Sequence, residues 1–265
     1  MGGALVQGIV LIAHVNPNLV TVADMDEKRL KELAEKFNVN VTTNNREAMR
    51  GADVLLLSVK PQKMEEVLAG LDASLEPNIT CITIAAGIAT SFIEERLGKE
   101  VRVIRVMPNM PAQIGEGVAA LCRGSHATDL DIEVAREIFE AVGTSVEVKE
   151  EMMDAVTALS GSGPGYAFYI LDAFAEAGSR MGFAWDVSLK LISQSFVGAA
   201  KLCLKGEKHP TELKNMVATP GGTTMAGLKV MEDGGLKQML ASVVEEATKR
   251  SAELGGRKYI PPHSS

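Results

Sequence analysis

Three apolar segments of the sequence repeat one pattern: Val-Leu-Leu-Leu-Ser-Val-Lys-Pro-Gln at residues 54–62, Ile-Thr-Cys-Ile-Thr-Ile-Ala-Ala-Gly at 79–87 and Val-Arg-Val-Ile-Arg-Val-Met-Pro-Asn at 101–109. Each segment begins with a run rich in apolar or β-branched residues and ends in a loop that contains Pro or Gly. Apolar strands that alternate with helical stretches are typical of a parallel sheet whose two faces are covered by helices. We therefore predict strands at Val54–Val59, Ile79–Ile84 and Val101–Val106.

The same alternation continues to about Glu150 and then stops. It predicts further strands at Leu19–Ala23, Gly117–Leu121 and Ser145–Val148, and helices at Asp26–Phe37, from Gln62, at Ser91–Leu97 and at Asp129–Ala141. Beyond Glu150 only helical segments remain, punctuated by Gly and Pro. The sequence therefore predicts two domains, an α/β domain at residues 1–150 and an all-α domain at residues 151–265.

The segment Tyr166–Ala177 is apolar on nearly every side, as expected of a helix that is buried. A small helical domain has difficulty enclosing such a helix by itself. We therefore predict a homodimer in which helices from two chains pack together, with a higher homo-oligomer built from dimers as the alternative.

The composition is that of a soluble globular protein, with 46% hydrophobic residues, 23% charged residues and a net charge of -7. There is no basic stripe, so we expect no nucleic-acid partner. Three widely spaced cysteines and four isolated histidines suit a reducing cytoplasm and predict no metal site. The short apolar segment Ala4–Val15 lacks a preceding positive charge, so we expect no secretory signal, and no stretch approaches the length of a membrane span.

In a doubly wound sheet, ligands bind beyond the carboxyl ends of the strands. The three strands of the repeated pattern are followed by Lys60-Pro61-Gln62, by Ala85-Ala86-Gly87 and by Met107-Pro108-Asn109. Any one of these loops could simply end a strand. Their alignment on one edge of the sheet predicts a binding site there.

Two segments of the second half also suit a ligand. Ser160–Tyr166 carries three glycines and a proline ahead of the apolar helix, so its N–H groups could receive an anion; a hinge between domains is the alternative. In Thr219–Thr224 the N–H groups of Gly222, Thr223 and Thr224 would converge on a carboxylate. A glycine-rich turn between helices is the alternative for this segment.

Four motifs together resemble those of the pyrroline-5-carboxylate reductases in order and spacing: Ser-Val-Lys-Pro-Gln at 58–62, Val-Met-Pro-Asn at 106–109, Leu-Ser-Gly-Ser-Gly-Pro at 159–164 and Thr-Pro-Gly-Gly-Thr-Thr at 219–224. The resemblance extends from Met1 to about Leu254. It implies a Rossmann-type parallel-sheet domain followed by an all-α dimerisation domain. It also implies reduction of 1-pyrroline-5-carboxylate, a cyclic imino acid, to L-proline by NADPH or NADH, the last step of proline biosynthesis.

The resemblance further implies where the two ligands bind. The cofactor would lie along Gly2, Asn45, Ser58, Lys60 and Pro61, with its nicotinamide bordered by Ala86, Gly87, Pro108 and Asn109. The substrate would be held by Thr219, Gly222, Thr223 and Thr224, with the Thr224 hydroxyl reaching the ring nitrogen. The tail Arg257–Ser265 is unlike the family and is expected to be dispensable.

Asp24 follows the predicted strand Leu19–Ala23, where an acidic residue commonly binds the adenosine ribose hydroxyls. A carboxylate at this place repels the 2′-phosphate of NADPH and favours NADH. The alternative is that Asp24 caps the helix that begins near Asp26.

The family begins with a strand and the motif Gly-x-Gly-Asn-Met-Gly, whereas this sequence begins at Met1-Gly2, inside that motif. We therefore expect a helix from Gly3 to about Ala13, a gap in the middle of the sheet, and weaker dinucleotide binding than in a chain with about ten more N-terminal residues. An incomplete sequence or a misplaced start would explain the gap.

No His, Lys or acidic residue occurs within Pro220–Thr224 to protonate the imine nitrogen. Thr224 is therefore expected to orient the imine and to relay a proton from water, unless the imine binds already protonated. Catalysis would then rest on the proximity of the two bound reactants.

Two other functions remain open. A β-hydroxyacid dehydrogenase would carry a Lys general acid at the start of the helical domain, but Ser160–Tyr169 contains none. A catalytically impaired nucleotide-binding or scaffold protein would have no need of the intact substrate loop.

Overall fold

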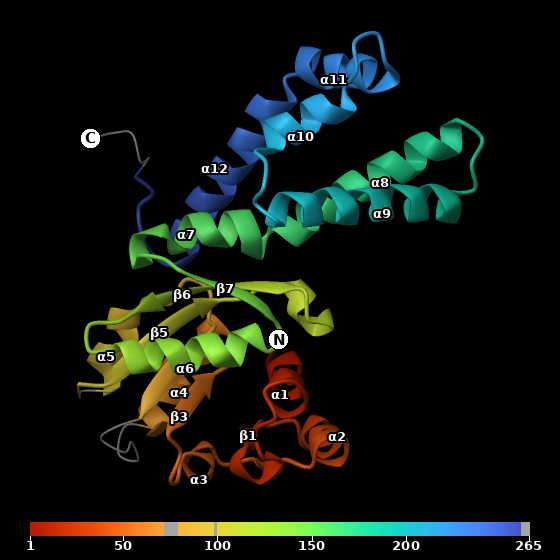
Figure 1. Cartoon of the computed structure of the whole chain (residues 1–265). Coiled ribbons are helices and arrows are strands. Elements are labelled where there is room, and N and C mark those ends of the chain that lie inside the picture. Colours follow the sequence, from red (N-terminus) through yellow and green to blue (C-terminus); the bar gives the residue numbers. More distant parts are fainter. Residues whose placement is uncertain (72–78, 98–99, 261–265) are drawn as a thin grey trace. The chain divides into compact units, whose positions relative to one another are not determined.

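The computed structural model describes residues 1–71, 79–97 and 100–260 (Figure 1). These form two compact units, which are described separately: unit 1 comprises residues 1–162 and 246–265, and unit 2 comprises residues 163–245. The two units are defined by which residues contact one another. By this measure the first helical turns after residue 150 and the C-terminal segment belong to unit 1. The predicted domain boundary at residue 150 stays a prediction.

Unit 1 contains seven strands among its described residues, and they form two sheets. The strands are β1 (Thr21–Ala23), β2 (Asn40–Thr42), β3 (Val54–Leu57), β4 (Thr80–Thr83), β5 (Arg102–Met107), β6 (Gly117–Arg123) and β7 (Gly143–Glu147). One sheet pairs β1 with β2, and the other has the order β3-β4-β5-β6-β7. No described strand joins β1 to β3, so the expected interruption of the sheet is present.

Strands β3, β4 and β5 are parallel, as the three apolar segments predict. Strand β6, in contrast, runs antiparallel to β5, which corrects the expectation of a wholly parallel sheet. Only residues 108–116 connect these two strands, and they form a short 3₁₀ helix at Met110–Ile114. A parallel crossover needs a longer connection, so the chain returns antiparallel.

The helices of unit 1 follow the prediction closely. They are α1 (Gly2–Leu11), α2 (Glu27–Phe37), α3 (Asn45–Ala48), α4 (Met64–Leu71), α5 (Thr90–Leu97), α6 (Asp129–Glu140) and α7 (Met153–Val156), and α12 (Leu236–Leu254) ends in this unit. Among the strands and α-helices up to residue 150, β2 and α3 were not predicted; both are short and partly exposed, so neither has an apolar face long enough to be recognised.

Helix α1 lies between the two sheets and packs on both. Its Leu5 belongs to a buried cluster with Ile82 and Ile104 of the larger sheet. The next residue, Val6, packs with Phe37 and Val39 beside the smaller sheet. The two sheets are thus joined through the faces of one helix.

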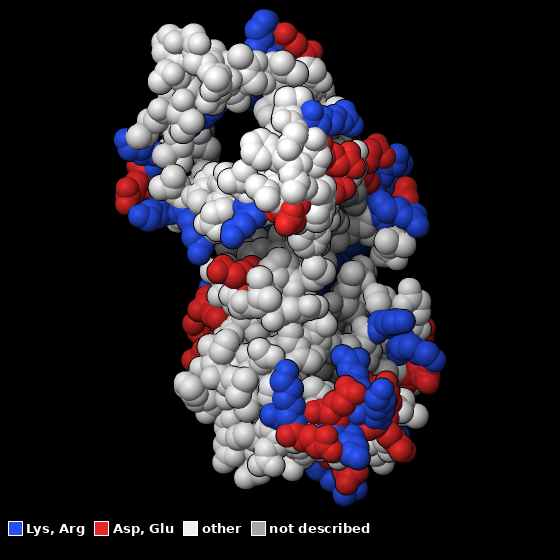
Figure 2. All heavy atoms as spheres, turned by 90° about the vertical axis from the view of Figure 1, so that its right-hand side faces the viewer, with Lys and Arg blue, Asp and Glu red and all other residues white. Residues whose placement is uncertain are grey.

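Unit 2 is entirely helical and buries very little of itself. Its helices are α8 (Gly163–Arg180), α9 (Trp185–Leu204), α10 (Pro210–Val217), α11 (Thr223–Asp233) and the first part of α12. Within residues 163–245, all of which the structure describes, only Ala175, Ser188 and Ala218 are buried. Burial of the predicted apolar helix is therefore not achieved within one chain. Figure 2 shows that much of the helical unit on the visible side is uncharged.

Helix α9 corrects one expectation from the sequence. It has 20 residues and a mean hydropathy of 1.3, so by length and composition it could cross a membrane. Length and composition are weak indicators, since the core helix of a soluble protein passes the same test.

Candidate functional site

Three predicted loops lie at one edge of the larger sheet. The parallel register places Leu57 beside Thr83 and Thr83 beside Arg105. Residues that follow these strands therefore leave the sheet at the same edge. They are Ser58, Lys60 and Pro61 after β3, Ala86 and Gly87 after β4, and Pro108 and Asn109 after β5. The alignment expected from the sequence is present.

The start of helix α1 lies against this edge. A Cβ atom on Gly2, the first residue of α1, would come within 3.0 Å of the Ser58 hydroxyl oxygen. The first N–H groups of a helix have no acceptor within the helix, and they favour a bound anion. Gly2 and Ser58, far apart in sequence, thus form a close backbone approach suited to a dinucleotide pyrophosphate.

Asp24 lies just beyond β1, but it does not cap helix α2. One of its oxygens accepts from the Asp26 N–H at 3.1 Å, and the other lies 3.6 Å from Arg29 Nη1. The cap is Asp26 itself, whose side chain accepts from the Arg29 N–H. The capping alternative for Asp24 is therefore wrong.

Asn45 is exposed at the start of the short helix α3. Its neighbour Asn44 caps that helix by accepting from the Arg46 and Glu47 N–H groups. Asn45 is therefore not the cap of its own helix.

Pro108 and Asn109 are both buried in the structure. The Asn109 amide donates to the Ser160 carbonyl at 3.2 Å, and its oxygen accepts from the Val118 N–H at 3.0 Å. Ser160 belongs to a π-helix at Thr157–Gly161, in the segment where the sequence predicted an anion loop or a hinge. Asn109 therefore ties the loop after β5 to the residues that end unit 1, a contact with no sequence signal.

The predicted substrate residues lie in unit 2, on the turn that leads into α11. Gly221 has a φ of +72°, in the left-handed region that favours glycine. A Cβ atom on Gly222 would come within 2.6 Å of the Thr219 hydroxyl oxygen. Gly222 is the N-cap, so Thr223 and Thr224 supply N–H groups of the first helical turn. The Gly222 N–H itself donates to the Thr219 carbonyl at 2.9 Å, and the convergence of all three N–H groups on a carboxylate stays a prediction.

A buried ion pair that the sequence analysis missed lies beside the loop after β4. Glu150 accepts from Arg105 Nη1 at 3.1 Å and from both the N–H and the hydroxyl of Thr90, at 2.9 and 2.7 Å. Burial disfavours the charged carboxylate, but the hydrogen bonds from Thr90 and Arg105 outweigh it and hold the pKa of Glu150 below its usual range. Arg105 stands at an alternating position of an apolar strand, and the sequence gives no partner for it.

Cys81 and Cys122 are buried core residues, and their thiols are not suited to act as nucleophiles. Burial raises the pKa of the Cys81 thiol to about 12. The pKa of Cys122 is also raised to about 12, chiefly by burial and further by the Glu150 carboxylate. Both thiols therefore stay protonated at neutral pH. Within residues 1–71, 79–97 and 100–260, no group of three or more His, Cys, Asp or Glu side chains could hold a metal ion.

Two family descriptions match the chain. Residues 150–254 match pyrroline-5-carboxylate reductase dimerisation, and residues 1–105 match NADP oxidoreductase coenzyme F420-dependent. A pyrroline-5-carboxylate reductase of Methanosarcina acetivorans is 41% identical over 96% of this chain and 94% of its own length. One of Arabidopsis thaliana is 38% identical over 96% of this chain and 92% of its own length.

Solved structures agree with these matches. A pyrroline-5-carboxylate reductase from Coxiella burnetii has a TM-score of 0.92 and 33% identity, and the match covers 97% of this chain and 95% of that one. A Plasmodium falciparum pyrroline carboxylate reductase with NADP bound has a TM-score of 0.85 and 29% identity, over 96% of this chain and 94% of that one.

Proposed function

This chain belongs to the pyrroline-5-carboxylate reductase family, and we propose that it makes L-proline by the residues set out below. It is an NAD(P)H-dependent oxidoreductase that reduces 1-pyrroline-5-carboxylate, and it forms homo-oligomers. The alternatives of a β-hydroxyacid dehydrogenase or a scaffold protein are not favoured by these relatives.

The observation that carries the cofactor assignment is the close approach of Gly2 to Ser58 at the shared edge of β3, β4 and β5. The pyrophosphate lies at the N-terminus of α1, and Asn45, Lys60 and Pro61 extend the cofactor site from there. Asp24 takes the adenosine ribose hydroxyls. The loops after β4 and β5 border the nicotinamide, through Ala86 and Gly87 and through Pro108 and Asn109.

The substrate carboxylate binds the N–H groups at the start of α11, where Thr223 and Thr224 begin the first turn. Gly222 is the N-cap, which lets the ligand approach the backbone, and Thr219 supports it. The Thr224 hydroxyl orients the ring nitrogen and passes it a proton from water. The reduced nicotinamide supplies the hydride that C5 of the C=N bond accepts. The protein contributes the alignment of the two reactants.

The assembly is a homodimer, or a larger oligomer built from dimers, because unit 2 exposes large apolar side chains on every one of its helices. The net charge of -7 argues against a nucleic-acid partner. The three free cysteines suit a cytoplasmic location, without a membrane partner.

The test is an assay of NADH and NADPH oxidation with racemic pyrroline-5-carboxylate, beside a parallel assay with 3-hydroxy acids. We expect oxidation that depends on the imine. Turnover of a 3-hydroxy acid with no response to pyrroline-5-carboxylate would overturn the assignment.

A further inference from the structure

The backbone of the C-terminal segment touches the loop that follows β4. A Cβ atom on Gly255 would come within 2.9 Å of the Gly87 carbonyl oxygen, closer than real Cβ atoms approach backbone. Gly87 has a φ of +78°, and a Cβ there would come within 3.4 Å of the Gly255 backbone. The two glycines are thus in direct contact, and a side chain on Gly255 would have to move the loop.

The position of Gly255 is fixed by the way helix α12 ends. The Gly255 N–H donates to the Ser251 carbonyl, and the Arg257 N–H donates back to the Ala252 carbonyl at 2.9 Å. Between them Gly256 has a φ of +69°, the left-handed residue that commonly follows a helix. The turn Gly255–Arg257 is therefore a defined C-terminal cap, and Arg257 is not part of a dispensable tail; residues 261–265 lie outside the described residues.

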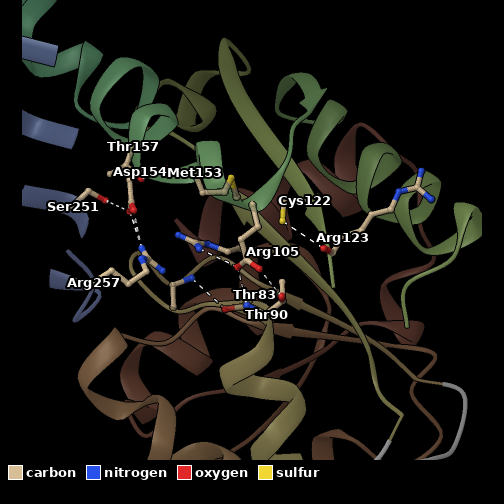
Figure 3. A network of polar contacts seen from close by, with 12 residues as sticks. Thr83, Thr90, Arg105, Cys122, Arg123, Met153, Asp154, Thr157, Ser251 and Arg257 are labelled. Carbon is tan, nitrogen blue, oxygen red and sulfur yellow. Dashed lines mark hydrogen bonds and ion pairs between the residues drawn. The ribbon is translucent and has the colours of Figure 1, made fainter. Parts of the chain in front are cut away.

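Asp154 of α7 anchors this cap from the other side. Arg257 Nη2 lies 2.8 and 3.0 Å from the two Asp154 carboxylate oxygens. The Ser251 hydroxyl, one turn before the end of α12, donates to the same carboxylate at 2.8 Å (Figure 3). One side chain thus fixes both the last turn of the helix and the residue beyond it.

Glu150, four positions before Asp154, holds the other end of the loop after β4, at Thr90. Glu150 binds both the N–H and the hydroxyl of Thr90, three positions after Gly87, and pairs with Arg105 of β5. Figure 3 shows the two groups of contacts close together, Arg105 and Thr90 in one and Asp154, Ser251 and Arg257 in the other. The loop after β4 is therefore held at Gly87 by the C-terminal cap and at Thr90 by Glu150.

We infer that Gly255–Arg257, named here the glycine clasp, is a positioning element that sets the loop Ala86–Gly87 and, through it, the nicotinamide half of the cofactor. This inference rests on the proposed function, which assigns Ala86 and Gly87 to the nicotinamide. Asp24 and Asn45, assigned to the adenosine half, follow β1 and β2 of the smaller sheet, whereas the clasp meets the loop after β4, so we expect it to act on the nicotinamide half.

The test compares ligands that contain and lack the nicotinamide. Dissociation constants for NADH, NADPH and ADP-ribose are measured for the parent chain and for Gly255→Ala. Gly255 has no positive φ, so alanine meets only the contact with Gly87 and Arg257. A loop displaced by a fraction of an ångström misplaces the nicotinamide, so we expect about tenfold weaker binding of NADH or NADPH, a lower kcat, and unchanged affinity for ADP-ribose.

Gly51→Ala, in the turn before β3 and outside the clasp, is the matched control. Its φ of +69° makes alanine strained, yet nothing lies within 4 Å of the added Cβ atom. This variant should melt at a lower temperature and keep the parent ratio of dinucleotide to ADP-ribose affinity. A shared loss of all three ligands in both variants would mean that the clasp only stabilises the fold, and would overturn the inference.

Arg257→Gln tests the role of the clasp in positioning the loop Ala86–Gly87 without adding a side chain at Gly255. It removes the ion pair to Asp154, so the clasp loosens and the nicotinamide-containing ligands alone should bind more weakly. If Gly255→Ala does not fold, this variant decides. Parent-like binding of NADH and NADPH by either folded variant would overturn the inference, whereas a parent chain that binds dinucleotides selectively but ignores pyrroline-5-carboxylate would overturn only the proposed function.

Discussion

The two units of this chain differ most in what they bury. In unit 1, residues such as Ile82, Val103, Ile104 and Leu121 are fully buried between the larger sheet and its helices. In unit 2, only Ala175, Ser188 and Ala218 are buried among residues 163–245. Phe168 is 52% exposed and Tyr169 is 79% exposed. Apolar surface of this extent is characteristic of a face that another chain covers. Unit 1 therefore has a core of its own, whereas unit 2 forms one by packing against another chain.

The largest expected effect comes from a charge on the apolar face of unit 2. Phe168→Asp places a carboxylate on α8, where assembly would bury it without a partner, at a cost of roughly 3–5 kcal/mol. We expect sedimentation to show dissociation at micromolar concentration and circular dichroism to show lost helicity. Leu130→Asp is the control, because Leu130 is 68% exposed on α6 of unit 1. Equal oligomer size for both variants and the parent would contradict the claim that another chain covers the apolar face of unit 2.

The next largest effect concerns the stability of unit 1. Glu150→Ala leaves Arg105, whose side chain is 3% exposed, without its carboxylate. Removing one partner of a buried pair should lower the free energy of unfolding by roughly 3 kcal/mol, at the low end because Glu150 is 32% exposed. Glu151→Ala is the matched control, since Glu151 is 75% exposed. Denaturant unfolding of both variants measures the difference, and equal midpoints would contradict the role of the pair.

The same residue predicts an acid dependence. The pKa of Glu150 is lowered in the folded chain from its usual 4.5, so its contribution to stability is complete above pH 4.5 and is lost as the pH falls through the lowered pKa. Glu150→Gln removes that titration. Its unfolding free energy should therefore fall less steeply on acidification than that of the parent, and parallel pH curves would contradict this.

The sequence predicted those parts of the molecule that repeat a local pattern. Strands β3, β4 and β5 were predicted because each lies in a run rich in apolar or β-branched residues, and their loops were aligned correctly because parallel strands end at one edge. The strand β6 was predicted but its antiparallel direction was not, because strand direction depends on the length of a connection and leaves no mark in the strand itself.

The contacts within the candidate site were harder to predict. Glu150 and Arg105 are 45 residues apart, and Gly87 meets Gly255 across most of the chain. Such pairs arise only from tertiary packing, so no spacing rule detects them. For Asp24 the sequence left two roles open, and the structure excludes the cap, which is Asp26, while the role in binding ribose stays a prediction.

Thr224→Val tests the proposed substrate turn, which lies in unit 2, the unit that buries few of its own side chains. The substitution keeps the shape of the side chain and removes the hydroxyl. Loss of one hydrogen bond to the reacting group should cost roughly 1.5–3 kcal/mol, or about tenfold or more in kcat/KM. Thr224→Ser keeps the hydroxyl and should retain most of the activity. An unchanged kcat/KM for the valine variant would transfer the role to backbone N–H groups or to water.

The smallest effect concerns the choice of cofactor in unit 1. Asp24 and Arg29 form an exposed pair at 3.6 Å, with side chains 35% and 51% exposed. The carboxylate repels the 2′-phosphate of NADPH and also pairs with Arg29, a cation that could bind that phosphate. Asp24→Ser removes the repulsion and releases Arg29, so the ratio of kcat/KM for NADPH to that for NADH should rise. Exposed ion pairs are worth at most about 1 kcal/mol, which limits the change to roughly fivefold.

Two further variants separate this effect from a change in the fold. Arg29→Ala combined with Asp24→Ser should lose part of the gain for NADPH, because no guanidinium remains to meet the phosphate. Asp26→Ser replaces the actual cap of α2 by another good capping residue, so it should leave the cofactor ratio unchanged. A strong preference for NADPH in the parent, unaltered in Asp24→Ser, would mean that Asp24 serves only the turn into α2 through the Asp26 N–H, and that unit 1 selects its cofactor elsewhere.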